Sequence, residues 1–250
     1  MADDEIIPES AQKYYSEKIA YLPSYQVSDA KRAISERIFT KAELGIPEDA
    51  FVYCCFNNIF KILPEVFTSW MEILKQVPKS VLFLYAHNEE ADKNLTQEAI
   101  KRGVDLARLI FGSRLPPAEY LARYKVADLF LDTFPYNAGT TASDSLWVGV
   151  PIMTRQGETF ASRVASSLLN AIDLPERITK TTREYGALAS SFGSSPETLQ
   201  ALRDRLDQNK LTTPLFDTVT FARNLEQLHF TAHVQARSGH GFQTIRLISG

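Results

Sequence analysis

A stretch rich in small polar residues, D-T-F-P-Y-N-A-G-T-T-A-S-D, occupies residues 132–144 between an apolar run and a helical pattern. Gly139 allows the backbone to approach a ligand closely, and Thr140 and Thr141 stand where a helix would begin. Free N–H groups and the helix dipole at such a position favour an anion, and the threonine hydroxyls are further donors. Asp144, one turn later, is suited to accepting hydrogen bonds from a ribose diol. The stretch indicates a phosphate or nucleotide site, but it also fits a helix N-cap with no ligand.

Two other side chains are suited to the same kind of site. Lys61 follows a pair of asparagines after an apolar run, and a cation there could neutralise a diphosphate. Tyr120 lies in a helical pattern and could stack on a base. Taken singly, each also fits an ordinary structural role, Lys61 as a solvated loop lysine and Tyr120 as a residue at the edge of the core. Neither G-x-G-x-x-G nor the P-loop motif occurs.

Short apolar runs alternate with amphipathic patterns through the middle of the chain. The runs predict strands at 51–56, 81–85, 109–111, 129–131 and 151–153. The patterns after them predict a helix opening at Pro64 and helices at 92–102, 116–126, 140–148 and 160–171. Three further helices are expected at about 183–192, 196–208 and 218–236. Five strand-helix units indicate a parallel sheet with helices on both faces.

The predicted fold class is therefore α/β, a Rossmann-like doubly wound parallel sheet with extra C-terminal helices. We expect residues 1–48 to be a connecting segment packed on the lobe, residues 49–236 to form the lobe, and residues 237–250 to be a tail. Ligands of such sheets bind at the carboxyl ends of the strands. Three stretches meet at that rim: 57–61, 113–123 and 132–144.

The bulk composition excludes several classes. The 250 residues are 44% hydrophobic and 23% charged, with a net charge of −3, so we expect neither a nucleic-acid partner nor a membrane surface. The chain has no long apolar run and no secretory signal, and Cys54 and Cys55 are adjacent, which fits a reducing cytoplasm. His229 and His233 are one helical turn apart, but a zinc site needs at least one more protein ligand, so we expect no metal.

Four ordered motifs resemble one enzyme family. They are F-N-N-I-F-K at 56–61, L-P-P-A-E-Y-L-A-R-Y at 115–124, A-D-L-F-L-D-T-F-P-Y-N-A-G-T-T-A-S-D-S-L-W at 127–147 and G-E-T-F-A-S-R-V-A at 157–165. Together they resemble the C-terminal catalytic lobe of bacterial O-linked N-acetylglucosamine transferases. These belong to glycosyltransferase family 41, which also contains SPINDLY-type protein O-fucosyltransferases. The resemblance implies the C-terminal lobe of a two-lobed GT-B fold, with an N-terminal lobe and TPR repeats in the full-length protein.

The resemblance also implies roles for single residues. Lys61 matches the catalytic lysine that binds the diphosphate and stabilises the leaving group. Thr140 and Thr141 match threonines that hold the phosphates, Asp144 matches the ribose-binding aspartate, and Tyr120 matches a position beside the uracil. The full nucleotide-sugar-binding set is Asn58, Leu115, Tyr120, Arg123, Gly139, Thr140, Thr141 and Asp144.

The implied function is transfer of N-acetylglucosamine from UDP-GlcNAc to serine or threonine of proteins, with no metal required. Many O-GlcNAc transferases have a histidine where this chain has Gly139, and the N-A-G-T-T form is closer to the SPINDLY type. A GDP-fucose donor is therefore an alternative, and a non-catalytic nucleotide-binding or assembly module is another. No 34-residue repeat occurs. We expect a fragment that lacks the N-terminal lobe and TPR repeats and is inactive alone.

Overall fold

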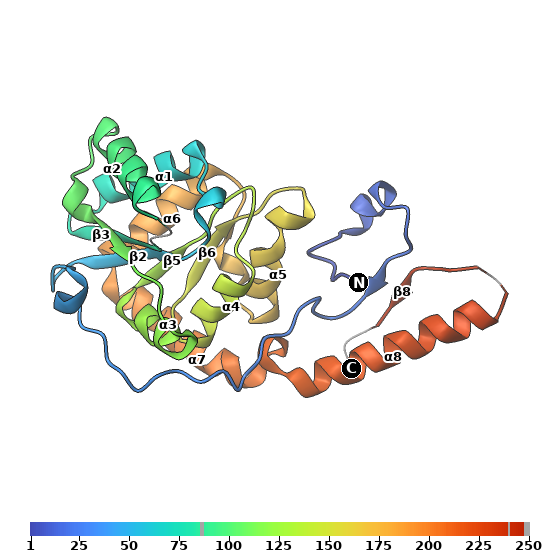
Figure 1. Cartoon of the computed structure of the whole chain (residues 1–250). Helices are drawn as coiled ribbons and strands as arrows, with labels where there is room; N and C mark the ends of the chain where they lie inside the picture. Colours follow the sequence, from blue (N-terminus) through green and yellow to red (C-terminus); the bar gives the residue numbers. More distant parts are fainter. Residues whose placement is uncertain (86–87, 240, 248–250) are drawn as a thin grey trace.

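The computed structural model of the 250-residue chain describes residues 1–85, 88–239 and 241–247. Its centre is a parallel sheet of six strands in the order β4-β3-β2-β5-β6-β7 (Figure 1). The strands are β2 (Phe51–Cys55), β3 (Ser80–Tyr85), β4 (Leu109–Gly112), β5 (Leu129–Leu131), β6 (Ile152–Arg155) and β7 (Ile178–Thr179). The expected doubly wound parallel sheet is confirmed.

The strand order creates a switch point between β2 and β5. From β2 the chain moves outward to β3 and β4, then returns to β5 beside β2 and continues outward in the other direction. Connections that leave two neighbouring strands in opposite directions open a crevice at their carboxyl ends, where ligands of such sheets bind. The motif at 132–144 follows β5 and the Asn57–Lys61 stretch follows β2, so both lie at this crevice.

Helices cover both faces of the sheet. The helices are α1 (Pro64–Gln76), α2 (Glu89–Lys101), α3 (Pro117–Arg123), α4 (Thr140–Trp147), α5 (Val164–Ala171), α6 (Thr182–Ser194), α7 (Pro196–Thr212) and α8 (Thr218–Arg237). On one face α1 packs against α6, and on the other α4 packs against α5 and α7 (Figure 1). Because both faces are covered, β2 reads as a continuous apolar run: Val52, Tyr53, Cys54 and Cys55 are all buried.

The predicted elements of the lobe match the structure closely, apart from a few differences such as the following. The helix expected at 92–102 begins earlier, because the Asn88 side chain caps it by accepting a 2.8 Å hydrogen bond from the Ala91 N–H. The helix expected at 160–171 is divided into a 3-10 turn, Phe160–Ser162, and α5. The sixth strand, β7, was not predicted, since two residues are too few to form an apolar pattern.

Two segments from opposite parts of the sequence pair beyond the sheet. Strand β1 (Ala20–Tyr21) pairs in parallel with β8 (Ile245–Arg246), which lies within the stretch expected to be a tail. Figure 1 shows this pair beside α8, and together they project from the lobe. A small separate core packs the N-terminal segment against Val164 of α5. Its other buried residues are Ala2, Ile6, Ile7, Ile19 and Tyr21.

A strap formed by residues 28–37 connects this projecting part to the lobe. The Ser28 N–H donates to the Leu215 carbonyl at 2.8 Å, and the Ser35 N–H donates to the Ala118 carbonyl at 3.0 Å. The strap therefore runs between fixed points along the side of the lobe that carries α3, α4 and α7 (Figure 1).

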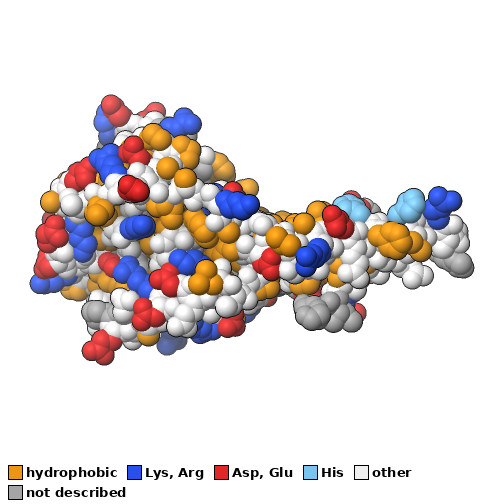
Figure 2. All heavy atoms as spheres, turned by 90° about the horizontal axis from the view of Figure 1, so that it is seen from below, with side chains coloured by type: hydrophobic (Ala, Val, Ile, Leu, Met, Phe, Trp, Pro, Cys, Tyr) orange, Lys and Arg blue, Asp and Glu red, His pale blue; other side chains and the backbone are white. Residues whose placement is uncertain are grey.

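The surface is of mixed charge. Figure 2 shows lysine and arginine side chains interspersed with aspartate and glutamate over the lobe. No helix in the described ranges is long and apolar enough to cross a membrane. Within those ranges, no three histidine, cysteine or acidic side chains are grouped closely enough to hold a metal ion.

Candidate functional site

The Lys61 side chain lies at the crevice between β2 and β5. It belongs to a short 3-10 turn, Ile59–Lys61, that follows the end of β2. Its ammonium donates a 2.9 Å hydrogen bond to the Asn137 carbonyl and lies 3.9 Å from the centroid of the Tyr136 ring. Partial burial lowers the pKa of Lys61, and the charge of Asp132 opposes this effect. A cation is thus held against the loop that follows β5.

Asp132 organises that loop from within. Its fully buried carboxylate accepts hydrogen bonds from the Thr154 hydroxyl at 2.6 Å and from the N–H groups of Thr133 and Ala138, both at 2.7 Å. Burial raises the pKa of Asp132 to about 6, while these hydrogen bonds and the Lys61 charge oppose the rise. The first residue of the quoted motif is therefore a structural anchor, a role that we did not predict.

Asn57 connects the loop to the start of α4. Its amide nitrogen donates to the Thr133 hydroxyl at 2.8 Å, and its amide oxygen accepts a hydrogen bond from the Thr141 hydroxyl. The Thr141 hydroxyl hydrogen is thus used inside the protein, and the N–H remains for a ligand. The neighbouring Asn58 is exposed at the N-cap of the 3-10 turn. The sequence placed Asn57 at the rim within the 57–61 stretch, but its role in holding this loop was not predicted.

The N-terminus of α4 is open. Gly139 is the N-cap, and no side chain caps the helix. Thr140 is exposed and Thr141 is half-buried. A Cβ at Gly139 would lie 3.6 Å from Val164 Cγ1, which is ordinary contact. The first N–H groups of a helix have no partner within it, so this end is suited to an anion.

The loop after β6 lies against the same region. The Asn137 N–H donates to the Ala161 carbonyl at 2.9 Å, and the Gly157 N–H donates to the Ser162 carbonyl at 2.9 Å. The stretch G-E-T at 157–159 therefore borders the loop that holds Lys61 in place.

A pocket of about 380 Å³ lies beside α4. It is lined by Phe56, Tyr85, Arg114, Leu115, Pro117, Tyr120 and Asp144. Three residues of the predicted set, Leu115, Tyr120 and Asp144, are thus brought together. The Tyr120 and Tyr124 hydroxyls are 2.7 Å apart, and burial raises the pKa of Tyr120.

Asp144 is almost completely buried and forms an ion pair with Arg32 of the strap. Burial raises the pKa of Asp144, and the Arg32 charge opposes that rise. No sequence pattern marked Arg32, which is 112 positions away from its partner.

Arg123 lies behind the pocket and does not line it. Its side chain is 1% exposed, and one guanidinium nitrogen donates to the Ser113 carbonyl at 2.6 Å. The guanidinium carbon lies 5.2 Å from the centroid of the Phe56 ring. A Cβ at Gly112 would lie 2.9 Å from the same guanidinium, so a glycine is needed for this close packing. Burial lowers the pKa of Arg123.

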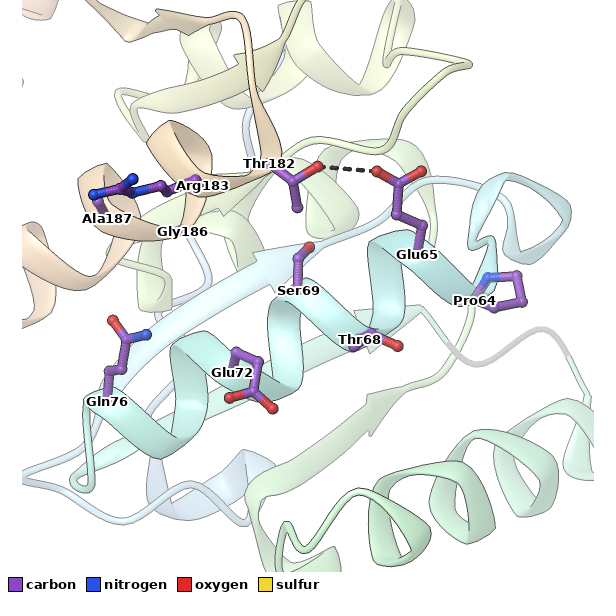
Figure 3. A pocket seen from close by; sticks show the side chains of 10 residues that line it. All are labelled: Pro64, Glu65, Thr68, Ser69, Glu72, Gln76, Thr182, Arg183, Gly186 and Ala187. Atoms are coloured by element: carbon purple, nitrogen blue, oxygen red, sulfur yellow. Dashed lines mark hydrogen bonds between the residues drawn. The ribbon is translucent and has the colours of Figure 1, made fainter.

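A second hollow, of about 570 Å³, lies between α1 and α6 and contains none of the predicted site residues. Figure 3 shows its side chains, including Glu65, which accepts a 2.9 Å hydrogen bond from the Thr182 hydroxyl. Most of the predicted set, all but Asn58 and Arg123, instead falls into two groups. Lys61 and the start of α4 form a cationic and N–H-rich group. Leu115, Tyr120 and Asp144 line the pocket, and Asp144 lies one helical turn along α4. Such an arrangement can hold an anion next to a ring and a hydroxyl-bearing group.

Comparison with known proteins places the chain in a family. The glycosyl transferase family 41 pattern matches residues 30–225. The chain is 35% identical over 237 residues to the probable UDP-N-acetylglucosamine–peptide N-acetylglucosaminyltransferase SEC of Arabidopsis thaliana, covering 92% of this chain and 24% of that protein. It is 34% identical to the protein of Hordeum vulgare that is named probable UDP-N-acetylglucosamine–peptide N-acetylglucosaminyltransferase SPINDLY, covering 70% of this chain and 19% of that protein. The chain thus spans about a quarter or less of these relatives.

A solved structure supports the same assignment. The structure of a Thermobaculum terrenum O-GlcNAc transferase mutant matches with a TM-score of 0.79 and 30% identity, covering 91% of this chain and 43% of that one. That neighbour is a GT-B glycosyltransferase, which confirms the expected fold class. The family pattern covers every residue between the strap and α8 and extends into both. The chain therefore belongs to glycosyltransferase family 41.

Proposed function

We propose that this chain is the nucleotide-sugar-binding lobe of a protein O-glycosyltransferase that moves N-acetylglucosamine from UDP-GlcNAc to serine or threonine hydroxyls. One observation carries the proposal: Lys61 and the uncapped N-terminus of α4 meet at the switch point of the sheet, beside the pocket lined by Leu115, Tyr120 and Asp144. A diphosphate would bind to the first group and the attached nucleoside in the pocket.

The reaction makes a nucleoside diphosphate leave with growing negative charge. Lys61 and the N–H groups of Gly139, Thr140 and Thr141 would bind that charge more strongly as it grows, which lowers the barrier. These donors need no reorganisation, because the contact with Asn137 holds the lysine and the contact with Asn57 holds the helix start. Charge stabilisation of this kind requires no metal.

The pocket would hold the nucleoside. Leu115 and Tyr120 offer apolar and aromatic surface for the base, and Asp144 offers acceptors for the ribose diol. Arg123, packed behind Tyr120, would support this wall, and the exposed Asn58 would contact the donor from the β2 side.

The names of the relatives support the donor and the acceptor. The Arabidopsis and Hordeum proteins carry the name of peptide N-acetylglucosaminyltransferases. The chain spans only part of their length, so we propose that an N-terminal lobe and TPR repeats complete the enzyme. On this basis the chain alone binds nucleotide and transfers sugar poorly or not at all.

One alternative is a SPINDLY-type lobe that uses GDP-fucose. It is favoured by Gly139 within the N-A-G-T-T stretch, where many O-GlcNAc transferases have a histidine. A non-catalytic nucleotide-binding module is a third possibility, favoured by the partial coverage of the relatives. Retention of Lys61, Thr140, Thr141 and Asp144 argues against a site that has lost its ligand.

Calorimetric titration of the chain with UDP and with GDP tests these proposals. We expect UDP to bind, and we expect Lys61→Ala and Asp144→Ala each to lower the affinity for UDP. Tighter binding of GDP would favour the fucose donor. Binding of neither nucleotide at millimolar concentration would refute a nucleotide site. Sugar transfer after adding a separately produced N-terminal lobe would exclude the non-catalytic module.

A further inference from the structure

The strap places one cation against the proposed ribose site. Arg32 donates through one guanidinium nitrogen to Asp144 Oδ1 and through the other to the Ser143 carbonyl at 3.3 Å. The Arg32 carbonyl in turn accepts a 3.2 Å hydrogen bond from the Trp147 indole. Backbone and side chain of this residue are therefore both fixed to α4.

We propose that Arg32 is a positioning residue of the nucleotide site, which holds Asp144 ionised and turned so that one carboxylate oxygen faces the pocket. The inference rests on the proposed function, because it assigns the ribose to Asp144. It adds a residue from the strap, outside the parallel sheet, to a site otherwise built from loops at the strand ends.

The hydrogen bonds of the carboxylate support this role. Arg32 occupies Oδ1, whereas Oδ2 accepts no hydrogen bond from any part of the chain that the structure describes. Asp144 lines the pocket, and its side chain is 9% exposed. An ionised carboxylate has about four acceptor positions, so one oxygen can pair with Arg32 while the other accepts from a ribose hydroxyl.

The surroundings explain why a cation is needed. Besides Arg32, the titratable or charged groups near Asp144 are Tyr85, Arg114, Tyr120 and Tyr124. Arg114 is a second cation in the pocket lining, but within the described residues only Arg32 forms an ion pair with Asp144. The tyrosines carry no positive charge, and burial favours the protonated carboxyl. A protonated carboxyl would present a donor where a diol needs acceptors. Arg32 counters this effect through Oδ1 and leaves Oδ2 for a ligand.

If Arg32 occluded the site, the effect of its removal would be reversed. If Arg32 only competed with a ribose for Asp144, its removal would tighten binding. The anchoring of the strap at Ser28 and Ser35, on both sides of Arg32, argues that the guanidinium stays in place. Positioning therefore fits the contacts better.

The test uses the whole chain and calorimetry with UDP, GDP and their 2′-deoxy forms. We expect Arg32→Ala to lower the affinity for the nucleotide that wild type prefers by about tenfold or more, as for loss of a charge-assisted hydrogen bond. The preference for ribose over deoxyribose should fall as well. Arg32→Lys should restore part of the affinity. Arg37→Ala is the control, since Arg37 lies on the same strap but pairs with Glu43 and Glu119.

Two further readouts separate positioning from a structural effect. Binding should weaken as pH falls through the pKa of Asp144, and in Arg32→Ala this decline should begin at higher pH. In an Asp144→Asn background, Arg32→Ala should have little additional effect. Unchanged or tighter binding by Arg32→Ala, or full additivity with Asp144→Asn, would overturn the inference. A wild type that binds neither UDP nor GDP would instead refute the proposed function, and the inference with it.

Discussion

The Lys61 ammonium donates a 2.9 Å hydrogen bond to the main-chain carbonyl of Asn137, so a cation that follows β2 is fixed by the loop that follows β5. An ammonium has three donors, and this is its one hydrogen bond within the described ranges of the chain. The two remaining donors make no hydrogen bond to these residues, and besides its contact with the Tyr136 ring the ammonium is available to a ligand at the switch point. The contact thus orients Lys61 without using up its capacity to bind an anion.

Removal of Lys61 should selectively weaken the binding of nucleoside diphosphates. We expect Lys61→Ala to reduce UDP affinity by about 1.5–3 kcal/mol, the usual value of a hydrogen bond to a charged group, and to leave uridine affinity unchanged. Calorimetry with both ligands measures the difference. Lys79→Ala is the matched control, because Lys79 is an exposed lysine paired with Asp49 next to the amino end of β3. Equal losses for UDP and uridine would show that Lys61 supports the fold and not the phosphates.

The charge of Lys61 should also give UDP binding an alkaline limit. Burial lowers the pKa of this ammonium, so the cation is lost at a lower pH than for an ordinary lysine. UDP affinity should therefore decline as pH rises through that lowered pKa. Lys61→Arg keeps its charge over the whole range and should show no such decline. If both proteins have the same alkaline profile, another group is responsible.

Elements with a local signal were predictable from the sequence. The apolar runs and the proline and glycine positions predicted five of the six sheet strands and all eight helices with small errors at their ends. The start of α4 was also predictable, because the small polar residues that mark it are adjacent in the sequence after β5. The roles of Asp132, Asn57 and Arg32 were not predicted, because they depend on partners far away in the sequence, such as Thr154, Thr141 and Asp144. Nothing in the neighbouring residues indicates which distant group a buried side chain will meet.

Asn57 should matter for stability more than its exposed neighbour. Asn57→Ala removes the acceptor of the Thr141 hydroxyl and a donor to Thr133, leaving polar groups unpaired at a buried junction. We expect a loss of about 1–3 kcal/mol in the free energy of unfolding, measured by urea denaturation. Asn58→Ala changes an exposed residue and should stay within about 0.5 kcal/mol of wild type. A similar small effect for both would mean that the junction tolerates unpaired groups.

Asp132 should make the folded state less stable as pH rises, which is opposite to the usual effect of a carboxylate. Its pKa is raised from 3.8 to about 6 in the folded state, because burial disfavours the charged carboxylate. Between these two values the folded chain binds a proton that the unfolded chain does not, so this group lowers stability as pH rises. Above both values the full penalty is present, roughly 3 kcal/mol, and below both it is absent.

Asp132→Asn isolates this contribution, since the amide is neutral at every pH and can donate to the Thr154 hydroxyl in place of accepting from it. We expect the free energy of unfolding of wild type, relative to Asp132→Asn, to increase as pH is lowered from 7.5 toward about 4, by up to roughly 3 kcal/mol. Urea denaturation of both proteins across this range measures it, and acid effects of all other groups cancel in the comparison. Parallel curves would indicate an ordinary pKa. A relative loss of wild-type stability in acid would indicate that the surrounding donors outweigh burial and depress the pKa.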